Sequence, residues 1–272
     1  RAACAKSPVP ALEGILLKAQ DGQLQLTGYD LELGIVTTIE AKTEQPGQLI
    51  LSARLLLDII RRIPAQTVSI LSDERDLATI RGGASEFTIP GLNAEEYPEL
   101  PNFEQQSDLV LKQGVLKSMI DQTLFAIATT DSKPVHTGSL FDVKDSCVTL
   151  VSVDGYRLAL RREPIVSDLT TRFIVPGKTL AEISKLLKEE DEEAYLALSQ
   201  KHIVFRIGGY YVVSRLLEGE FLDYNAAIPK VSKTTVKINT RSLTDAWDRT
   251  SLLISTGCAA PSACPRWTRR CS

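Results

Sequence analysis

The stretches 26-LTGYDLEL-33 and 150-LVSVDGYRLAL-160 decide the fold, because they are two versions of one pattern. Their aspartates, Asp30 and Asp154, stand 124 residues apart, and the leucines that open the two stretches keep the same offset. Apolar and polar residues alternate before each aspartate, as in a half-buried β-strand. An internal repeat fixes the architecture before single elements are assigned. The sequence therefore predicts a chain built from copies of one unit.

The same offset continues into an amphipathic helix. Segment 52–63 carries apolar residues at helical spacing, and a second apolar stripe follows Pro176 at Leu180, Ile183 and Leu187, again 124 residues later. Strand-like runs surround both segments, so each unit mixes many strands with a few helices. This composition predicts an α+β fold in which an antiparallel sheet is covered on one side by two helices per unit.

Further matches set the boundaries of the copies. The glycine pair at 82–83 matches the pair at 208–209 with an offset of 126, and we expect both pairs to close hairpins. A third copy begins late in the chain, where Leu116, Asp121 and Thr123 recur as Leu243, Asp248 and Thr250. We therefore predict a first copy at 1–103 without its first helix, a complete second copy at 104–229, and a truncated third copy at 230–272. Residues 258–272 break the pattern and are predicted to be foreign to the fold.

Composition and charge restrict the classes of protein to which the chain can belong. Hydrophobic residues make up 43% of the chain and charged residues 24%, which is typical of a folded globular protein. The net charge of −3 gives no overall attraction to nucleic acid, so any polyanion must meet a local basic face. Apolar runs are too short to span a bilayer.

Cysteine usage predicts a cytoplasmic protein without a metal site. Cys4 and Cys147 are isolated, as expected in a reducing compartment. Three more cysteines, Cys258, Cys264 and Cys271, crowd into the tail, but their spacing lacks the close pairs that zinc sites favour.

Basic residues recur on equivalent helices. Arg54, Arg61 and Arg62 share one helix flank in the first copy, and Lys178, Lys185 and Lys188 share one in the second. Such a charge run is most often a solvated surface. A cation at the same place in two copies of an acidic protein favours instead a shared face that attracts phosphates without reading base sequence.

Signals for catalysis are weak. Gly177, Lys178 and Thr179 resemble the end of a phosphate-binding loop, but the motif requires a glycine where Arg172 stands. His136 and His202 lie in no recognisable nucleophile setting, and the acidic run 189–193 lacks the spacing of a calcium loop. We predict a protein that is not an enzyme and needs no cofactor.

A family resemblance rests on residues in each copy. They are KSPVP at 6–10 with Gly14, LTGYDLE at 26–32, VDGYRLA at 153–159 and SRLLEGEF at 214–221. With these residues the chain resembles the bacterial DNA sliding clamps, the beta subunits of DNA polymerase III, from about Lys6 to Leu253. The resemblance implies a ring-shaped, head-to-tail homodimer with helices inside and sheets outside. Such a clamp encircles duplex DNA and tethers the replicative polymerase, which raises processivity in replication.

The resemblance also implies the site residues. DNA-facing positions match Lys6, Arg54, Arg61, Lys133 and Lys178. A groove for short peptides of the polymerase alpha subunit, the clamp loader and other proteins matches Val153, Asp154, Gly155, Tyr156, Arg157, Leu158, Leu222, Ala226 and Ala227. The dimer contact matches Leu252 and Leu253.

The sequence departs from the family pattern at two groove positions, and two alternative functions stay open. The family often has Pro where Leu222 stands and Arg where Ala226 stands, which weakens the expected rim of the groove. The net negative charge is compatible with a scaffold that binds peptides but not DNA. The triplet at 177–179 allows a nucleotide-binding enzyme.

Overall fold

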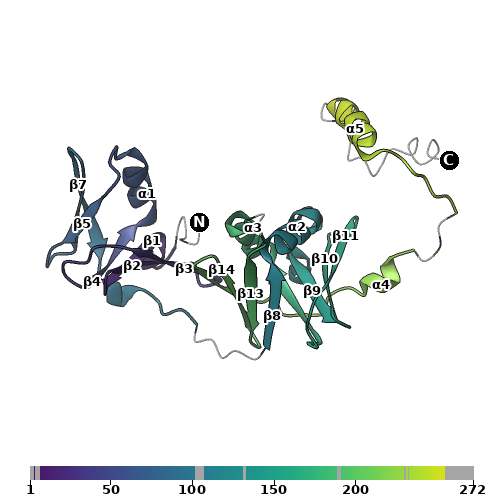
Figure 1. Ribbon diagram of the computed structural model, residues 1–272, viewed down its shortest axis with the longest axis horizontal. Coiled ribbons are helices and arrows are strands. Elements are labelled where there is room, and N and C mark those ends of the chain that lie inside the picture. Colours follow the sequence, from purple (N-terminus) through teal and green to yellow (C-terminus); the bar gives the residue numbers. More distant parts are fainter. Residues whose placement is uncertain are drawn as a thin grey trace. The chain divides into compact units, whose positions relative to one another are not determined.

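A computed structural model describes residues 3, 7–101, 107–130, 133–188, 191–229, 231 and 233–254 (Figure 1). The chain forms two compact units, Arg1–Leu222 and Asp223–Ser272. Each unit is described by itself. Within the described residues, none of the helices combines the length and the apolar character needed to cross a membrane.

In its described residues, the first copy contains strands β1 to β7 and the α-helix α1. Its elements are η1 (Pro10–Glu13), β1 (Gly14–Gln20), β2 (Gln23–Tyr29), β3 (Leu33–Glu40), β4 (Gly47–Ser52), α1 (Ala53–Arg62), β5 (Ser69–Ser72), β6 (Leu77–Gly82), β7 (Ser85–Leu92) and η2 (Ala94–Glu96). The predicted helix at 52–63 is confirmed as α1, with its ends shifted inward by one residue.

The second copy repeats this order after an added strand and helix. Its elements up to residue 222 are β8 (Ser107–Lys112), α2 (Gln113–Thr123), η3 (Leu124–Ala126), η4 (Pro134–Thr137), β9 (Gly138–Lys144), β10 (Cys147–Val153), β11 (Leu158–Pro164), β12 (Thr171–Pro176), α3 (Gly177–Leu186), β13 (Glu193–Leu198), β14 (His202–Ile207) and β15 (Tyr210–Arg215). All strand pairs are antiparallel, which confirms the predicted α+β class.

Strand register confirms the repeat residue by residue. Leu16 pairs with Thr27 between β1 and β2, and Leu140 pairs with Val151 between β9 and β10, each 124 positions later. The same offset relates β4 to β12 and β3 to β11. Since a slip of one residue would turn every side chain to the opposite face, the two copies share one inside and one outside.

The predicted match of the glycine pairs is wrong by one residue. Gly82 lies in β6 and pairs with Ser85, whereas Gly208 lies in the turn between Ile207 and Tyr210, which pair with each other. Residues 83–84 therefore form the β6–β7 turn of the first copy. This turn lies 125 positions before the β14–β15 turn at 208–209, and not 126 as predicted. Gly83, Gly208 and Gly209 have positive φ, as a two-residue hairpin turn requires.

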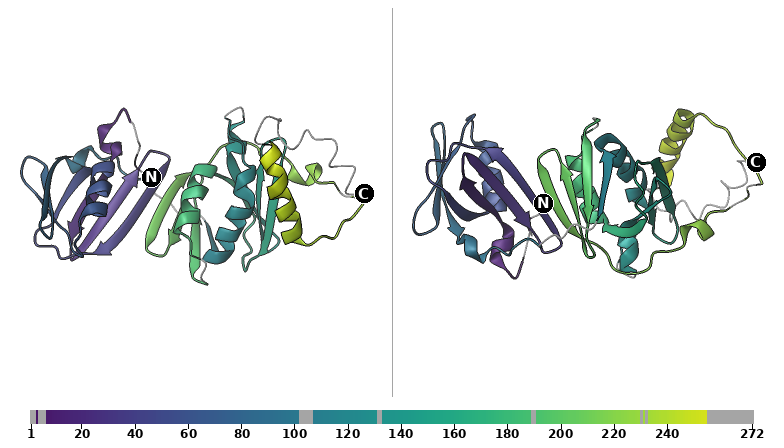
Figure 2. Two further views of the ribbon diagram at one scale, coloured as in Figure 1. Left: turned by 90° about the horizontal axis from the view of Figure 1, so that it is seen from above. Right: turned by 60° about the horizontal axis from the view of Figure 1, so that its bottom comes forward.

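One strand pair joins the two copies. β3 of the first copy pairs with β15 of the second, and the strand order β5-β6-β7-β4-β1-β2-β3-β15-β14-β13-β8 therefore crosses the boundary. The remaining strands form a four-stranded sheet in the order β11-β10-β9-β12, with β11 at its edge. In Figures 1 and 2, helices α1 and α3 rise from the same side of the joined sheet.

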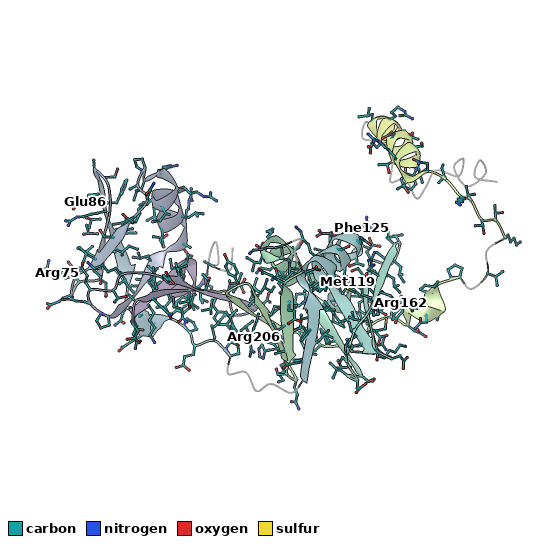
Figure 3. The ribbon with its side chains drawn as sticks, viewed as in Figure 1. Arg75, Glu86, Met119, Phe125, Arg162 and Arg206 are labelled. Carbon is teal, nitrogen blue, oxygen red and sulfur yellow. The ribbon has the colours of Figure 1, made fainter. Side chains whose placement is uncertain are left out.

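Each helix buries its apolar face against its own strands. Leu56 and Ile59 of α1 are buried with residues of β1, β4, β6 and β7. In the second copy, Leu180 and Ile183 of α3 join α2 residues such as Met119 in a larger core (Figure 3). Packing of this kind, rather than intrinsic propensity, supplies most of a short helix's stability.

The second unit contains α4 (Tyr224–Ala227) and α5 (Thr240–Ile254). Helix α5 begins 127 residues after α2 begins, as the repeat predicts. In both helices the threonine hydroxyl bonds back to the carbonyl four residues earlier, from Thr123 to Met119 and from Thr250 to Ala246, at 2.8 Å in each case. The domain boundaries at 103 and 229 stay predictions.

Two neighbouring leucines of α1 test the packing. Leu56 is 6% exposed and Leu57 is 49% exposed. We expect Leu56→Ala to lower the free energy of unfolding by about 2–5 kcal/mol, because it leaves a cavity in the core. Leu57→Ala is the matched control and should change it by less than about 0.5 kcal/mol. Urea denaturation measures both, and equal effects would contradict the assignment of the buried face.

Candidate functional sites

Exposed basic side chains lie on equivalent helices of the two copies. Arg54 and Arg61 are exposed on α1, and Lys178 is exposed on α3. Lys133 is also exposed, at the start of η4. Lys6 lies outside the described residues. The four described cations can therefore meet solvent or a ligand from the surface.

Several of the nearby lysines already contact carboxylates. Lys185 donates to Glu182 on α3 at 2.7 Å, and Lys188 lies 3.9 Å from Glu192. Lys178 donates to the Asp30 carboxylate in the first copy. The side chain of Lys178 is nevertheless 56% exposed. The basic face is thus partly neutralised on α3, and pairs within a helix weaken its attraction for phosphate.

A tight turn joins β10 to β11 and carries the predicted groove residues. The Asp154 carboxylate accepts hydrogen bonds from the backbone N–H groups of Tyr156 and Arg157, both at 2.9 Å. Its second oxygen accepts from the Arg157 guanidinium, also at 2.9 Å. These backbone N–H groups first, and then Arg157, hold the pKa of Asp154 below its ordinary value of 3.8. Gly155 has a φ of 92°, which suits glycine in this turn.

Phe125 is a further residue of this surface that sequence reasoning missed. Phe125 is 60% exposed, and the Arg157 guanidinium lies over its ring. The distance from Arg157 Cζ to the ring centroid is 5.9 Å. Arg157 is therefore held between the Asp154 carboxylate and the Phe125 ring by an ion pair and a cation–π contact. No sequence pattern indicates this contact, because Phe125 lies in η3 and Arg157 lies in the turn between β10 and β11.

The other predicted groove residues differ in exposure. Tyr156 is 93% exposed, whereas Val153 is buried and Leu158 is half-buried. Leu222 is 42% exposed at the end of the first unit. Ala226 and Ala227 are exposed on α4 and belong to the second unit, so a groove shared between them and the β10–β11 turn stays a prediction.

The predicted dimer contact lies on α5. Leu252 is 71% exposed, as an unshielded interface residue would be. Leu253 is part of the helix, but its side chain lies outside the described residues. Their contact with another copy stays a prediction.

The triplet at 177–179 has structural contacts. A side chain at Gly177 would lie 2.2 Å from Ile127 and 2.8 Å from the Thr137 carbonyl. Thr179 is buried, and its hydroxyl is 2.7 Å from the Ser214 hydroxyl. These contacts explain Gly177 and Thr179 as the start of α3 after β12, where Gly177 is closely packed and the Thr179 hydroxyl is bonded within the core.

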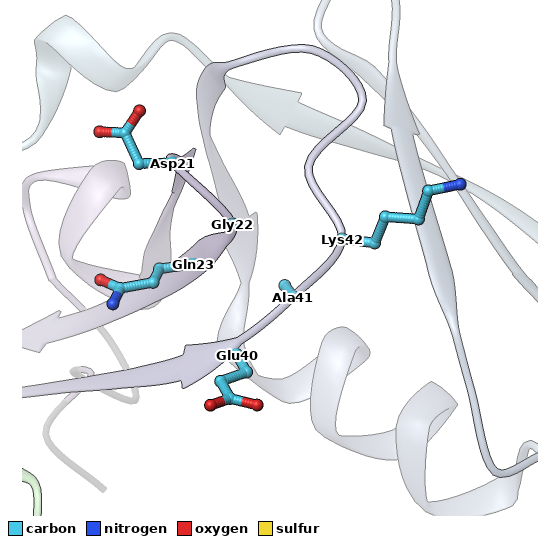
Figure 4. A pocket seen from close by; sticks show the side chains of 6 residues that line it. All are labelled: Asp21, Gly22, Gln23, Glu40, Ala41 and Lys42. Atoms are coloured by element: carbon cyan, nitrogen blue, oxygen red, sulfur yellow. The ribbon is translucent and has the colours of Figure 1, made fainter.

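Two hollows lie elsewhere. One of about 510 Å³ borders the β1–β2 turn and is lined by Asp21, Gly22, Gln23, Glu40, Ala41 and Lys42 (Figure 4). The other, of about 230 Å³, lies beside β12 and includes Arg172 and Phe221. Among the predicted site residues whose side chains the structure describes, none lines either hollow. No three His, Cys, Asp or Glu side chains gather to hold a metal ion in the part of the chain that the structure describes.

Comparison with known proteins gives a consistent picture over most of the chain. Residues 2–101 match the N-terminal domain of the DNA polymerase III beta subunit, and residues 110–223 match its central domain. The beta sliding clamp of Bacillus subtilis is 34% identical over an alignment of 267 positions, and the match covers 94% of this chain and 71% of the relative.

Solved structures agree. A putative DNA polymerase III beta subunit from Eubacterium rectale superposes with a TM-score of 0.89 at 33% identity, covering 94% of this chain and 71% of that one. A sliding clamp from Pseudomonas aeruginosa bound to griselimycin gives a TM-score of 0.87 at 30% identity, with coverages of 92% and 69%.

The Asp154 turn makes a pH-dependent contribution to stability. Because the folded pKa of Asp154 is lowered, the contribution is present above pH 3.8 and is lost as the pH falls through the lower folded value. We expect Asp154→Ala to lower the free energy of unfolding at pH 7 by about 1 kcal/mol, as for a lost capping aspartate. Asp154→Asn keeps an oxygen acceptor and should cost less. Urea denaturation at pH 7 and pH 3 measures the effect, and a cost for Asp154→Ala that is equal at both pH values would contradict the role of the carboxylate.

Proposed function

The chain belongs to the DNA polymerase III beta subunit family, the bacterial sliding clamps, and we propose from this premise which of its residues contact DNA and partner proteins. A sliding clamp encircles duplex DNA and tethers the replicative polymerase. It thereby converts repeated rebinding into an intramolecular event at the primer end. The role is topological, so we propose that the chain has no catalytic activity and no cofactor.

The DNA-facing surface consists of Lys6, Arg54, Arg61, Lys133 and Lys178. The observation that carries this proposal is the placement of exposed cations on α1 and α3, which are equivalent helices of two copies. Flexible, exposed cations bind phosphates without fixing a base sequence. A clamp needs this kind of contact because it must slide along any sequence.

The residues that we propose to contact partners are those of the β10–β11 turn at 153–158 and Leu222 in the first unit, and Ala226 and Ala227 in the second. Tyr156 and the braced Arg157 offer an exposed aromatic ring and a fixed guanidinium, which are common anchors in interfaces. The proposed occupants are short peptides of the polymerase alpha subunit, the clamp loader and other clamp-binding proteins.

Leu252 and Leu253 would contact the first copy of a second chain in a head-to-tail homodimer. We also propose a cytoplasmic location, because bacterial DNA is replicated there.

Two alternatives are less well supported. A scaffold that binds peptides but not DNA would make no use of the exposed Arg54 and Arg61 of α1. A nucleotide-binding enzyme would need the triplet at 177–179 to be available, whereas Thr179 is buried and bonded to Ser214.

Salt dependence tests DNA binding. We expect the double variant Arg54→Ala and Arg61→Ala to weaken binding to duplex DNA and to reduce the slope of log K against log salt by about 2, because each lost phosphate contact removes about 0.9. Arg75, an exposed arginine in the β5–β6 turn, provides the control Arg75→Ala (Figure 3). Fluorescence anisotropy over a salt series measures the slope. An unchanged slope in the double variant would favour the scaffold.

Peptide affinity tests the partner surface. We expect Arg157→Ala to weaken binding of a clamp-binding peptide from the polymerase alpha subunit by about tenfold or more, as for loss of an interface anchor. Arg162→Ala on β11 is the matched control, since Arg162 is exposed outside the turn. Isothermal titration calorimetry measures both. Equal affinities for the two variants would place the peptide elsewhere.

A further inference from the structure

The turn between β2 and β3 makes a polar contact across the boundary between the copies. One oxygen of the Asp30 carboxylate accepts from the backbone N–H groups of Glu32 and Leu33, at 3.1 and 2.7 Å. The other oxygen accepts from the ammonium group of Lys178, the second residue of α3. The Asp30 side chain is only 4% exposed. A carboxylate so far removed from water needs a cation, because an uncompensated buried charge is costly.

An apolar contact accompanies this ion pair. Leu33 is fully buried, and it belongs to the same core cluster as Leu109, Leu196 and Val212 of the second copy. In addition, the backbone N–H of Arg215 donates to the Glu32 carbonyl at 2.9 Å. The β2–β3 turn therefore contacts the second copy through the polar side chain of Asp30 and the apolar side chain of Leu33.

The repeat supplies an internal comparison. The β10–β11 turn has the same geometry, with Asp154 in the place of Asp30 and the same two backbone N–H donors. Its cation, however, comes from its own Arg157, which stands 124 residues after Leu33. The first turn thus carries a leucine that is buried in the neighbour, and the second carries an arginine that is 54% exposed.

We propose that Asp30 and Lys178 form an interdomain brace that positions the first copy against the second. The brace and the buried Leu33 together attach the β2–β3 turn to the second copy. The equivalent β10–β11 turn keeps its cation within itself and stays open to partners. Lys178 is in this role a positioning residue, and the brace stands whether or not Lys178 also contacts phosphate.

Hydrogen–deuterium exchange on the full chain tests the brace. Asp30→Asn keeps an oxygen acceptor for the turn and removes the charge, and Lys178→Met removes the ammonium group and keeps the length of the stem. We expect each variant to speed exchange of the β3 and β15 amides by about three- to tenfold, because these amides are protected by the joint between the copies. Exchange in β9 and β10, inside the second copy, should not change.

Further variants make the result specific. The double variant should exchange no faster than either single variant, since both remove one interaction. Lys178→Arg should keep exchange close to that of the parent chain. Lys185→Met is the matched control, because Lys185 pairs with Glu182 within α3 and crosses no boundary. Unchanged exchange in both single variants, or faster exchange in Lys178→Met alone, would overturn the brace.

DNA binding by the same variants separates the brace from the proposed function. If Lys178 contacts phosphate, Lys178→Met weakens duplex binding and Asp30→Asn does not. If both variants loosen β3 and β15 and neither weakens DNA binding, the brace is supported and Lys178 is removed from the DNA-facing set. If Lys178→Met weakens DNA binding and exchange is unchanged, the brace fails and the DNA contact is supported.

Discussion

Pairing of β3 with β15 is the constraint on which the structure of the first unit depends. It makes one sheet out of strands from two copies and fixes their register across the boundary. Main-chain pairing alone would allow a slip by two residues that keeps each face correct. Leu33 in the neighbouring core and the Asp30–Lys178 contact exclude such a slip, because both depend on one position of the turn. The placement of α1 relative to α3, and hence of their cations, follows from this joint.

Much of the fold was predictable from the sequence because the unit is repeated. The offset of 124 residues identified α1, α3 and the strands before them, and register in the structure keeps it. The glycine match failed by one residue because Gly82 ends β6, whereas Gly208 starts a turn. Glycine pairs look alike in sequence, but only the pairing partners show which residues form the turn.

The sites were predictable in part, and the contacts were not. Exposed cations on equivalent helices follow from periodicity, as does the turn at 153–158 from the repeat. The pairing of Lys178 with Asp30 joins residues 148 positions apart, so no local pattern could indicate it. Phe125 was missed for the same reason, since its partner Arg157 lies on a different element. The two copies differ at the equivalent positions Leu33 and Arg157. This difference was the sequence feature that could have indicated different roles for the two turns.

Strand β11, one of the two edge strands of the four-stranded sheet, carries residues that protect its edge. An edge strand presents backbone groups that can recruit any extended chain, and natural proteins guard such edges with charge and proline. β11 ends in Arg161, Arg162, Glu163 and Pro164, so its distal half discourages indiscriminate addition. Its proximal half, Leu158 to Leu160, is uncharged and half-buried. The charged end of β11 thus discourages addition of an extended chain, whereas the uncharged end lacks this protection.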